Sequence, residues 1–313
     1  MQSILIVVPA YNEEKNIPLL YGELKKVFAP LRDSYAFEIL FINDGSCDNT
    51  LGEIEKLAEI DEHVKYLDFS RNFGKEVAST AGLNNCQADA CLMIDSDLQH
   101  PVELIPQFLE KWQAGAEVVV GIRKKNKSDS ILKRVGSTFF YFVINRISDV
   151  RIVPNATDFR LLDKKVVEEF NRFSETNRMT RALIDWLGFR RDYLYFEAND
   201  RVNGTASYSF WKLFGLAMNS FVSLSLMPLK LAGYLGAVIT LIAGVSGFYI
   251  LLGKYFLHLP LASTFSDSEN LAILILFLVG IMLTSIGLIS FYVANIHTEV
   301  IRRPMYVTRK RKL

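Results

Sequence analysis

The sequence has few cysteines, and none of them are arranged to bind zinc. Cys47, Cys86 and Cys91 are the three cysteines in 313 residues, with no C-x-x-C pair and no cluster of cysteine with histidine. An odd number of separated thiols is typical of reduced cysteines in the cytoplasm. This pattern argues against both a secreted disulfide scaffold and a zinc site.

Glycine-rich nucleotide-binding patterns are also missing. No G-x-G-x-x-G follows the first apolar run, Ile4–Val8, and the chain has no G-x-x-x-x-G-K-[ST] loop. Any nucleotide would therefore be held by side chains and a metal ion. The run Ile4–Val8 is also too short for a signal peptide, has no basic flank and leads into Pro9. We therefore expect the N-terminal part to stay in the cytosol.

Charge of one sign is not in excess either. The formal net charge is +1, which gives no general argument for nucleic-acid binding. Half of the residues are hydrophobic and 22% are charged, so the chain is too apolar for an ordinary soluble enzyme unless the apolar residues are concentrated. They are concentrated in the C-terminal third, which predicts a soluble N-terminal domain and a membrane-associated remainder.

Apolar runs alternate with helical patterns up to about residue 125. The predicted strands are Ile4–Val8, Glu38–Ile42, Val64–Phe69, Ala90–Ile94 and Glu117–Val120. The predicted helices are Ile17–Phe28, Thr50–Ala58, Glu76–Leu83 and Val102–Trp112. This alternating order predicts an α/β fold with a mostly parallel sheet covered by helices on both faces.

Two carboxylates follow the fourth predicted strand. Asp95 and Asp97 are one residue apart, and Pro101 then opens the next helical pattern. Open α/β sheets bind ligands at this end of their strands, and a divalent cation can be shared between carboxylates and phosphates. We interpret the pair as a site for Mg²⁺ or Mn²⁺ with a diphosphate. A solvated turn rich in acids is the alternative.

Polar residues also follow the other early strands. Tyr11 follows the first strand, Asp44 the second, and Arg71 and Lys75 the third, so four strand ends form one polar rim. Tyr11 could stack on a base, and Asp44 could accept hydrogen bonds from a base or ribose. Simple turn chemistry, surface packing and solvated charges are the alternatives at these positions.

Four motifs carry a family resemblance. Val8–Glu13 (VPAYNE), Phe41–Ser46 (FINDGS), Arg71–Lys75 (RNFGK) and Asp95–Pro101 (DSDLQHP) together resemble family 2 glycosyltransferases. Among these the chain is most similar to polyprenyl-phosphate sugar transferases, the bactoprenol glucosyltransferases and dolichol-phosphate mannose synthases. The resemblance covers nearly the whole chain. It implies a GT-A fold, a nucleotide-diphosphate sugar donor and a lipid-phosphate acceptor.

The resemblance also implies roles for individual residues. Asp95, Asp97 and Gln99 are expected around the metal. The residues expected to bind the donor are Pro9, Tyr11, Glu13, Asp44, Lys75 and, in a loop that closes over the diphosphate, Arg201. In that loop Ala206 and Ser207 replace the hydroxyl and lysine usual in the family, which leaves open either the strength of the contact with the diphosphate or the family's usual donor.

Asp158 lies in a stretch, Asp-Phe-Arg-Leu, that in the family contributes an aspartate to the active site. We expect it to orient a group or contact the metal, because an anionic phosphate needs no strong base to remove a proton. A helix N-cap or an ion pair with Arg160 is the alternative.

A locally basic stretch follows the fifth predicted strand. Arg123 and Arg134 lie in it, and arginine offers two parallel donors to a phosphate. In the resembling enzymes arginines here hold the lipid phosphate, so we assign both residues that role. The apolar stretch Val135–Ile147 beyond them fits either the core or the membrane surface.

The last third predicts membrane anchoring. Residues 209–228 read as interfacial amphipathic helices, and Leu231–Leu252 and Leu271–Ala294 each have about the length needed to cross a bilayer. The link 257–270 lacks Lys and Arg, whereas the end of the chain is basic. By the positive-inside rule both termini face the cytoplasm. A buried soluble hairpin is the alternative.

These observations give one domain plan. We expect a cytoplasmic GT-A domain at 1–208, interfacial helices at 209–228, a two-helix transmembrane hairpin at 229–297 and a basic cytoplasmic tail at 298–313. The protein would lie in a bacterial plasma membrane, with its catalytic domain and both termini in the cytoplasm.

The expected activity is metal-dependent, inverting transfer of one sugar to undecaprenyl phosphate. Glucose from UDP-glucose is the first choice of donor, and N-acetylglucosamine, galactose and mannose donors stay open. By resemblance we also expect a homo-oligomer, a lipid-sugar flippase and a downstream glycosyltransferase as partners. A processive synthase is less favoured, because the chain has no Gln-x-x-Arg-Trp motif and only two spans. An inactive scaffold is the non-enzymatic alternative.

Overall fold

The computed structural model describes residues 1–124, 153, 155–175, 179–197, 267–301 and 303–313. The chain divides into two units. One holds a mixed sheet with its covering helices, built from the described residues up to 197 and from 303 onward. The other holds the long helix α10 (Asp267–Ile301).

The described strands form an eight-stranded sheet in the order β7-β5-β6-β4-β1-β2-β3-β8. The strands are β1 (Gln2–Ala10), β2 (Tyr35–Asn43), β3 (Val64–Phe69), β4 (Ala90–Met93), β5 (Val118–Arg123), β6 (Ala156–Asp163), β7 (Arg191–Phe196) and β8 (Thr308–Lys312). Strands β1 to β4 are parallel, whereas β6 runs antiparallel to β4 and β5, and β8 antiparallel to β3. The predicted mostly parallel sheet is confirmed.

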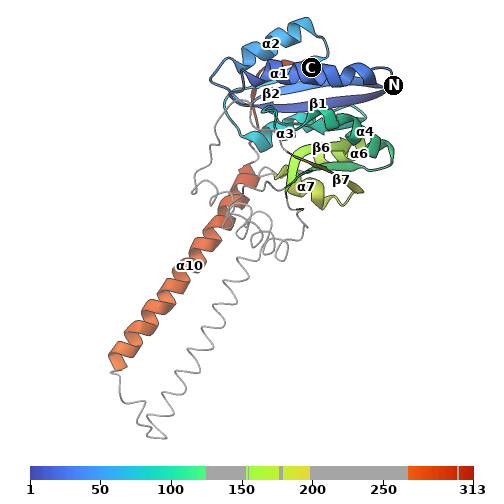
Figure 1. Ribbon diagram of the computed structural model, residues 1–313. Helices are drawn as coiled ribbons and strands as arrows, with labels where there is room; N and C mark the ends of the chain where they lie inside the picture. Colours follow the sequence, from blue (N-terminus) through green and yellow to red (C-terminus); the bar gives the residue numbers. More distant parts are fainter. Residues whose placement is uncertain (125–152, 154, 176–178, 198–266, 302) are drawn as a thin grey trace. The chain divides into compact units, whose positions relative to one another are not determined.

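Helices cover both faces of this sheet (Figure 1). One face packs on α1 (Asn16–Phe28), α2 (Thr50–Ile60) and α4 (Ile105–Gln113), with short 3₁₀ turns η1 (Ala29–Leu31) and η2 (Val102–Leu104). The other packs on α3 (Lys75–Asn84), α6 (Lys164–Asn171) and α7 (Thr180–Trp186). The four predicted helices are confirmed, except that the fourth begins as the 3₁₀ turn η2 ahead of α4.

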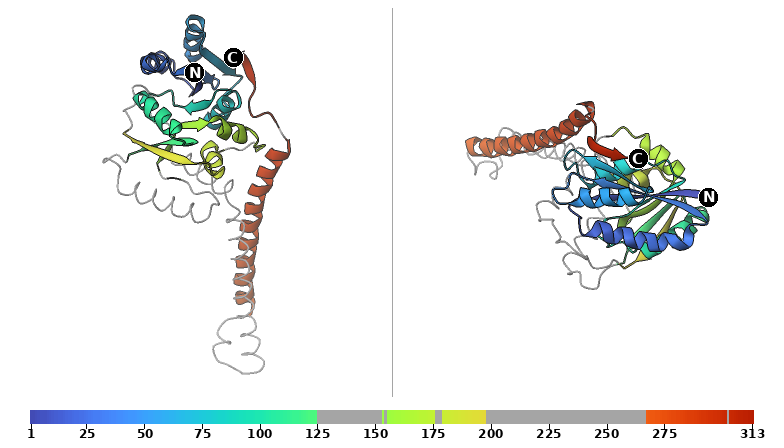
Figure 2. Two further views of the ribbon diagram at one scale, coloured as in Figure 1. Left: turned by 90° about the vertical axis from the view of Figure 1, so that its right-hand side faces the viewer. Right: turned by 90° about the horizontal axis from the view of Figure 1, so that it is seen from above.

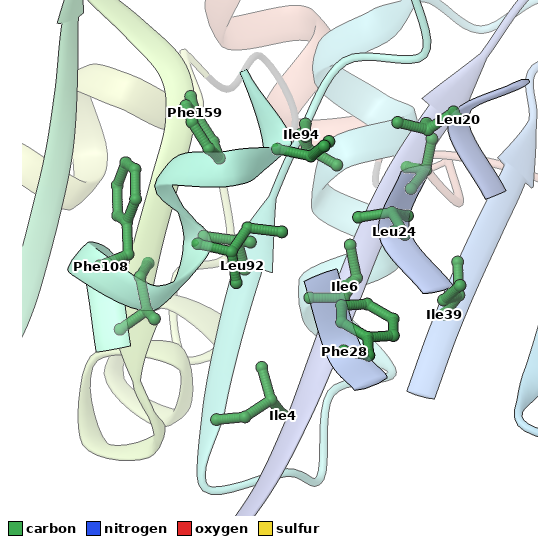
Figure 3. Packing of buried hydrophobic residues seen from close by; sticks show 14 of the residues in the cluster. Ile4, Ile6, Leu20, Leu24, Phe28, Ile39, Leu92, Ile94, Phe108 and Phe159 are labelled. Carbon is green, nitrogen blue, oxygen red and sulfur yellow. The ribbon is translucent and has the colours of Figure 1, made fainter. Parts of the chain in front are cut away.

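The core explains why the segment Ile4–Val8 of the first strand is apolar throughout. Successive side chains of β1 point to opposite faces, so Ile4 and Ile6 pack toward α1 while Leu5 and Val7 pack toward α3. Figure 3 shows Ile4, Ile6 and Leu92 among the side chains on the face of the sheet that packs on α1, α2 and α4. Full burial of such a side chain contributes about 1.5–3 kcal/mol. Both faces of the strand therefore help to fix the sheet.

The structure adds strands that the periodicity did not predict. Strands β6 and β7 follow β5 in the chain; β6 is inserted between β4 and β5, and β7 extends the sheet beside β5. On the other side β8, from the basic tail, closes the edge beside β3 (Figure 2). The basic tail therefore contributes one strand to this sheet.

Helix α10 contains the second predicted span, Leu271–Ala294. Within the described part of the chain, no helix is both long and apolar enough to cross a membrane. The first predicted span, Leu231–Leu252, and the interfacial segment 209–228 lie outside the described residues. The membrane anchor therefore stays a prediction.

Candidate active site

The candidate site forms at one edge of the sheet. Parallel strands β1 to β4 end at this edge, so the loops that follow them lie together. Strand β6 runs the other way, with Met93 opposite Arg160, which brings its beginning to the same edge. Asp158, near the start of β6, therefore lies close to Asp95, which follows β4. The sequence put these residues in separate motifs, and the antiparallel strand brings them together.

Lys75 joins the two carboxylates. Its Nζ lies 2.6 Å from Oδ1 of Asp95 and 2.7 Å from Oδ2 of Asp158. On the other side of Asp158, Nε of Arg181 lies 2.7 Å from Oδ1. The side chain of Asp158 is 13% exposed and that of Lys75 is 48% exposed, so the cluster is open to solvent at its lysine.

These contacts fix the charges in the cluster. Burial raises the pKa of Asp158, but Lys75 and Arg181 outweigh it and hold that pKa well below its usual range. Burial lowers the pKa of Lys75, but Asp95 and Asp158 outweigh it and raise that pKa above its usual value. Asp158 is therefore a carboxylate and Lys75 an ammonium at neutral pH. Such a carboxylate is a poor acceptor for a proton from substrate.

The loop after β4 holds the predicted metal ligands. Asp97 Oδ1 accepts a hydrogen bond from the backbone N–H of Gln99 at 3.2 Å. Leu98, between them, has φ 61°, in the left-handed region that residues other than glycine rarely adopt. Strained backbone of this kind is concentrated at functional sites. Its presence between Asp97 and Gln99 supports a binding role for this loop.

The donor set fits a hard divalent cation completed by substrate. The described residues contain no group of three or more His, Cys, Asp or Glu that could hold a metal by themselves. Mg²⁺ is commonly held by one or two carboxylates together with substrate phosphates and water. Asp95, Asp97 and Gln99 supply oxygen atoms of that kind, and Lys75 already occupies one oxygen of Asp95.

His100 supports Asp95 from the protein interior. Its Nδ1 accepts a hydrogen bond from the backbone N–H of Asp95 at 3.2 Å, and its ring stacks on Phe159 at 5.1 Å. Burial lowers the pKa of His100, so the ring is neutral at pH 7 and its proton lies on Nε2. That Nε2 is 3.8 Å from Oδ2 of Asp95. His100 lies in the DSDLQHP motif, but its sequence position predicted no role for it.

Asp44 is buried and holds a neighbouring loop. Its two carboxylate oxygens accept hydrogen bonds from the backbone N–H groups of Phe73 at 2.7 Å and Gly74 at 2.9 Å. Burial raises the pKa of Asp44, and the two N–H donors offset this only in part. The predicted contact with nucleotide is untested, and the structure adds this second role.

The other residues of the predicted donor set lie on the same edge. Tyr11 is 45% exposed just after β1, and Pro9 pairs with Ile42 inside the sheet. Glu13 accepts a hydrogen bond from the side chain of Asn16, and its backbone N–H donates to Oγ1 of Thr50. Glu13 therefore helps to fix the start of α1, and it lies in the loop that follows β1 at this edge.

The predicted acceptor residues are only partly described. Arg123 ends β5, which is parallel to β4, so it reaches the edge that carries Asp95. Arg134, and Arg201 of the donor set, lie outside the described residues.

The alternative roles considered for Asp158 do not fit its contacts. Asp158 pairs with Lys75 and Arg181, whereas Nη1 of Arg160 lies 3.3 Å from Oδ1 of Asp185. The N-cap of the next helix, α6, is Asp163, whose side chain accepts a hydrogen bond from the N–H of Lys165. The ion pair with Arg160 and the capping role of Asp158 are therefore both wrong.

A role for Arg181 was also not predicted from the sequence. It lies on α7, far along the chain from every motif, and no spacing or composition marks it. Packing of α7 against the face that carries α3 and α6 brings it to Asp158. A residue of this kind is found only from tertiary contacts.

Fold and site together define a class. A mostly parallel α/β sheet with paired carboxylates after its fourth strand and no glycine-rich phosphate loop is typical of GT-A glycosyltransferases. A model of the family described as "Glycosyl transferase family 2" matches residues 5–170, more than half of the chain. The chain belongs to this family and is a glycosyltransferase.

Relatives match over nearly the whole chain. A prophage bactoprenol glucosyl transferase homolog of Escherichia coli K12 is 38% identical over 99% of this chain and 99% of its own. The bactoprenol glucosyl transferase of Shigella phage SfII is 38% identical over 98% and 97%. An uncharacterized glycosyltransferase of Synechocystis, sll0501, is 36% identical over 96% and 93%. Among solved structures, a mannosyltransferase of Pyrobaculum calidifontis with GDP-Man and Mn²⁺ is 17% identical over 94% and 87%, with TM-score 0.45.

Proposed function

We propose that the protein transfers glucose from UDP-glucose to the phosphate of a polyprenyl lipid, undecaprenyl phosphate, with inversion at the sugar carbon. The observation that carries this proposal is the cluster of Asp95, Lys75 and Asp158 at the carboxyl edge of the sheet. Its support is the 38% identity, across nearly the full length of both chains, to proteins named as bactoprenol glucosyl transferases.

In the proposed reaction an oxygen of the lipid phosphate attacks the anomeric carbon of glucose. The bond from that carbon to the diphosphate breaks at the same time, and UDP leaves with the electron pair. The attacking phosphate is already an anion near neutral pH, so it needs no general base. The low pKa of Asp158 agrees with this, because a carboxylate held by Lys75 and Arg181 positions groups and does not take up protons.

Each described residue then has a part. Asp95, Asp97 and Gln99 would hold Mg²⁺ or Mn²⁺, which would neutralise the charge that develops on the leaving diphosphate. Lys75 joins the side chains of Asp95 and Asp158. Arg123, at the same edge, would bind the phosphate of the acceptor.

We also propose that the protein works at the cytoplasmic face of the membrane, anchored by the two predicted spans, because a polyprenyl lipid is confined to the bilayer. Helix α10 supports lipid contact, since Leu271, Ile275 and Met282 along it are more than half exposed. N-acetylglucosamine, galactose and mannose donors stay as alternatives to glucose.

The test is transfer from a panel of radiolabelled UDP- and GDP-sugars to undecaprenyl phosphate, by purified full-length protein with and without EDTA. A lipid-extractable product from UDP-glucose that is lost with EDTA supports the proposal, and a β-linked product supports inversion. Product from another donor corrects the sugar. Folded protein with added metal that forms no lipid product from any donor contradicts the proposal.

Arg123→Ala tests the acceptor assignment. We expect the apparent KM for undecaprenyl phosphate to rise while the KM for the sugar nucleotide stays constant. Arg172→Ala is the matched control, because Arg172 is an exposed arginine that follows α6 and pairs with Glu169 of that helix. An effect confined to the sugar nucleotide contradicts the role of Arg123.

A further inference from the structure

The last strand of the chain contacts the beginning of a loop of the active site. Strand β8 lies antiparallel to β3, with Phe69 opposite Thr308. Just beyond this pair, the backbone N–H of Ser70 donates to the carbonyl oxygen of Val307 at 2.8 Å. The C-terminal segment is thus joined to β3 where the strand gives way to the loop Ser70–Gly74.

Two side chains of the segment reinforce this junction. Nη2 of Arg309 donates to the carbonyl oxygen of Ser70 at 2.7 Å. The ring of Tyr306 stacks on Phe69, with centroids 4.9 Å apart and 19° between the planes. Phe69 in turn meets Phe73 of the loop edge-on at 5.7 Å. Arg309 therefore holds the first residue of the loop, and Tyr306 supports its aromatic side chain through Phe69.

The same loop is fixed to the active site at its other end. The N–H groups of Phe73 and Gly74 bind the two oxygens of Asp44. Gly45, beside Asp44, has φ 65°, and a Cβ there would lie 2.3 Å from the backbone carbon of Arg71, so the loop lies directly on this turn. The next residue after the loop is Lys75, which joins Asp95 to Asp158.

Covering a sheet edge would by itself explain a C-terminal strand. Some contacts of β8 fit that simple explanation: Lys310 pairs with Glu55 at 2.9 Å and Lys312 donates to the carbonyl oxygen of Ala58, both on α2. The contacts of Tyr306 and Arg309 differ, because they reach the loop and the residue that supports it. The strand therefore makes one set of contacts with the scaffold and another with the site.

We propose that Tyr306 and Arg309 are positioning residues for the sugar-nucleotide half of the active site. They hold the Ser70–Gly74 loop, and through it Asp44 and Lys75, in the arrangement that receives the donor. This inference rests on the proposed function, since it assigns the donor side of that reaction to this loop.

The experiment compares Arg309→Ala and Tyr306→Ala with two controls. Arg311→Ala removes the same charge from an exposed position on the same strand, and Tyr306→Phe keeps the stacking ring. We expect Arg309→Ala and Tyr306→Ala to raise the KM for UDP-glucose about 3- to 10-fold, as for the loss of one interaction of this kind. The KM for undecaprenyl phosphate should not change. Both controls should behave as the wild type.

Hydrogen exchange tests the same inference without any transfer reaction. The amides of Phe73 and Gly74 should exchange faster in Arg309→Ala than in Arg311→Ala. Equal exchange and equal KM values in these two variants overturn the inference, as does a loss of melting temperature that changes both KM values together. A wild type that transfers no sugar contradicts the proposed function instead, and the exchange comparison still decides the role of Arg309.

Discussion

Asp158 and Asp185 both bind two basic side chains, yet their surroundings differ. The side chain of Asp158 is 13% exposed and contacts Lys75, which is 48% exposed. The side chain of Asp185 is 3% exposed and contacts Arg160, which is 2% exposed. One cluster is open at its lysine, and the other, here called the closed cluster, is buried at Asp185 and Arg160 and partly exposed at Arg191.

The closed cluster is complete within the fold. Oδ1 of Asp185 lies 3.3 Å from Nη1 of Arg160 and 3.2 Å from Nη1 of Arg191. Nε of Arg160 also donates a hydrogen bond to the carbonyl oxygen of Thr157. Burial lowers the pKa of Arg160, because removing the charge from water costs free energy. Clusters with similar residues thus lie in different places: the closed one joins elements of the fold, and the open one lies at the edge of the sheet that carries the candidate site.

The largest expected effect is loss of transfer at the open site. Asp95→Ala and Asp97→Ala should each lower kcat on the order of 10²- to 10³-fold or more, because the leaving diphosphate loses its charge stabilisation. The melting temperature should change little. Asp192→Ala is the control. Asp192 is an exposed aspartate near the start of β7, at the end of the strand away from the site, and it pairs with Lys111. Appreciable activity in either site variant would rule out the metal assignment.

At the closed cluster the large effect should be on stability. Asp185→Ala leaves the buried Arg160 without its carboxylate and removes the partner of the partly exposed Arg191, which costs about 3–5 kcal/mol in the free energy of unfolding. Urea denaturation measures this cost, and Asp192→Ala, an exposed pair, should lose only about 0–1 kcal/mol. If Asp185→Ala instead kept its stability but lost transfer per folded molecule, the two clusters would not differ as we infer.

A smaller loss of activity is expected when the lysine of the open cluster is replaced. Lys75→Met removes the cation between Asp95 and Asp158 and leaves Arg181 as the basic partner of Asp158. We expect kcat to fall about 10- to 100-fold, below the loss for a group that stabilises charge directly. Lys111→Met, which breaks the exposed pair with Asp192, is the matched control. Equal rates in the two variants would show that Lys75 does not organise the site.

The smallest effect concerns pH. The pKa of Asp158 in the folded protein is well below its usual value, so Asp158→Asn should lower the rate by a constant factor between about pH 5.5 and 8, as expected for a group that stays ionised. A depressed pKa contributes stability that is present above the ordinary pKa, about 3.9, and is lost as pH falls toward the folded value. The stability difference between wild type and Asp158→Asn should therefore shrink below about pH 4. A rate ratio that titrates near neutral pH would identify Asp158 as a base.

Much of the sheet was predictable from local pattern. Apolar runs such as Ile4–Val8 are buried on both faces, so their composition alone indicates a strand between two layers of helices. The order of strands and helices then places Asp44 and Asp95 at one edge, because parallel strands end together. Strand β8 escaped prediction, since Thr308–Lys312 is four-fifths basic and its pairing depends on the exposed edge of β3 rather than on its own hydrophobicity.

The sequence by itself determined the family, the α/β class and the acidic residues of the site, because these depend on motifs and on short-range periodicity. Tertiary structure alone decided which charges meet. Lys75, Asp158 and Arg181 come from three elements far apart in the chain, and they converge because β6 runs antiparallel to β4 and α7 packs on the same face as α3. Electrostatic partners are set by distances in space, so the low pKa of Asp158 and the cation beside Asp95 follow only from the folded chain.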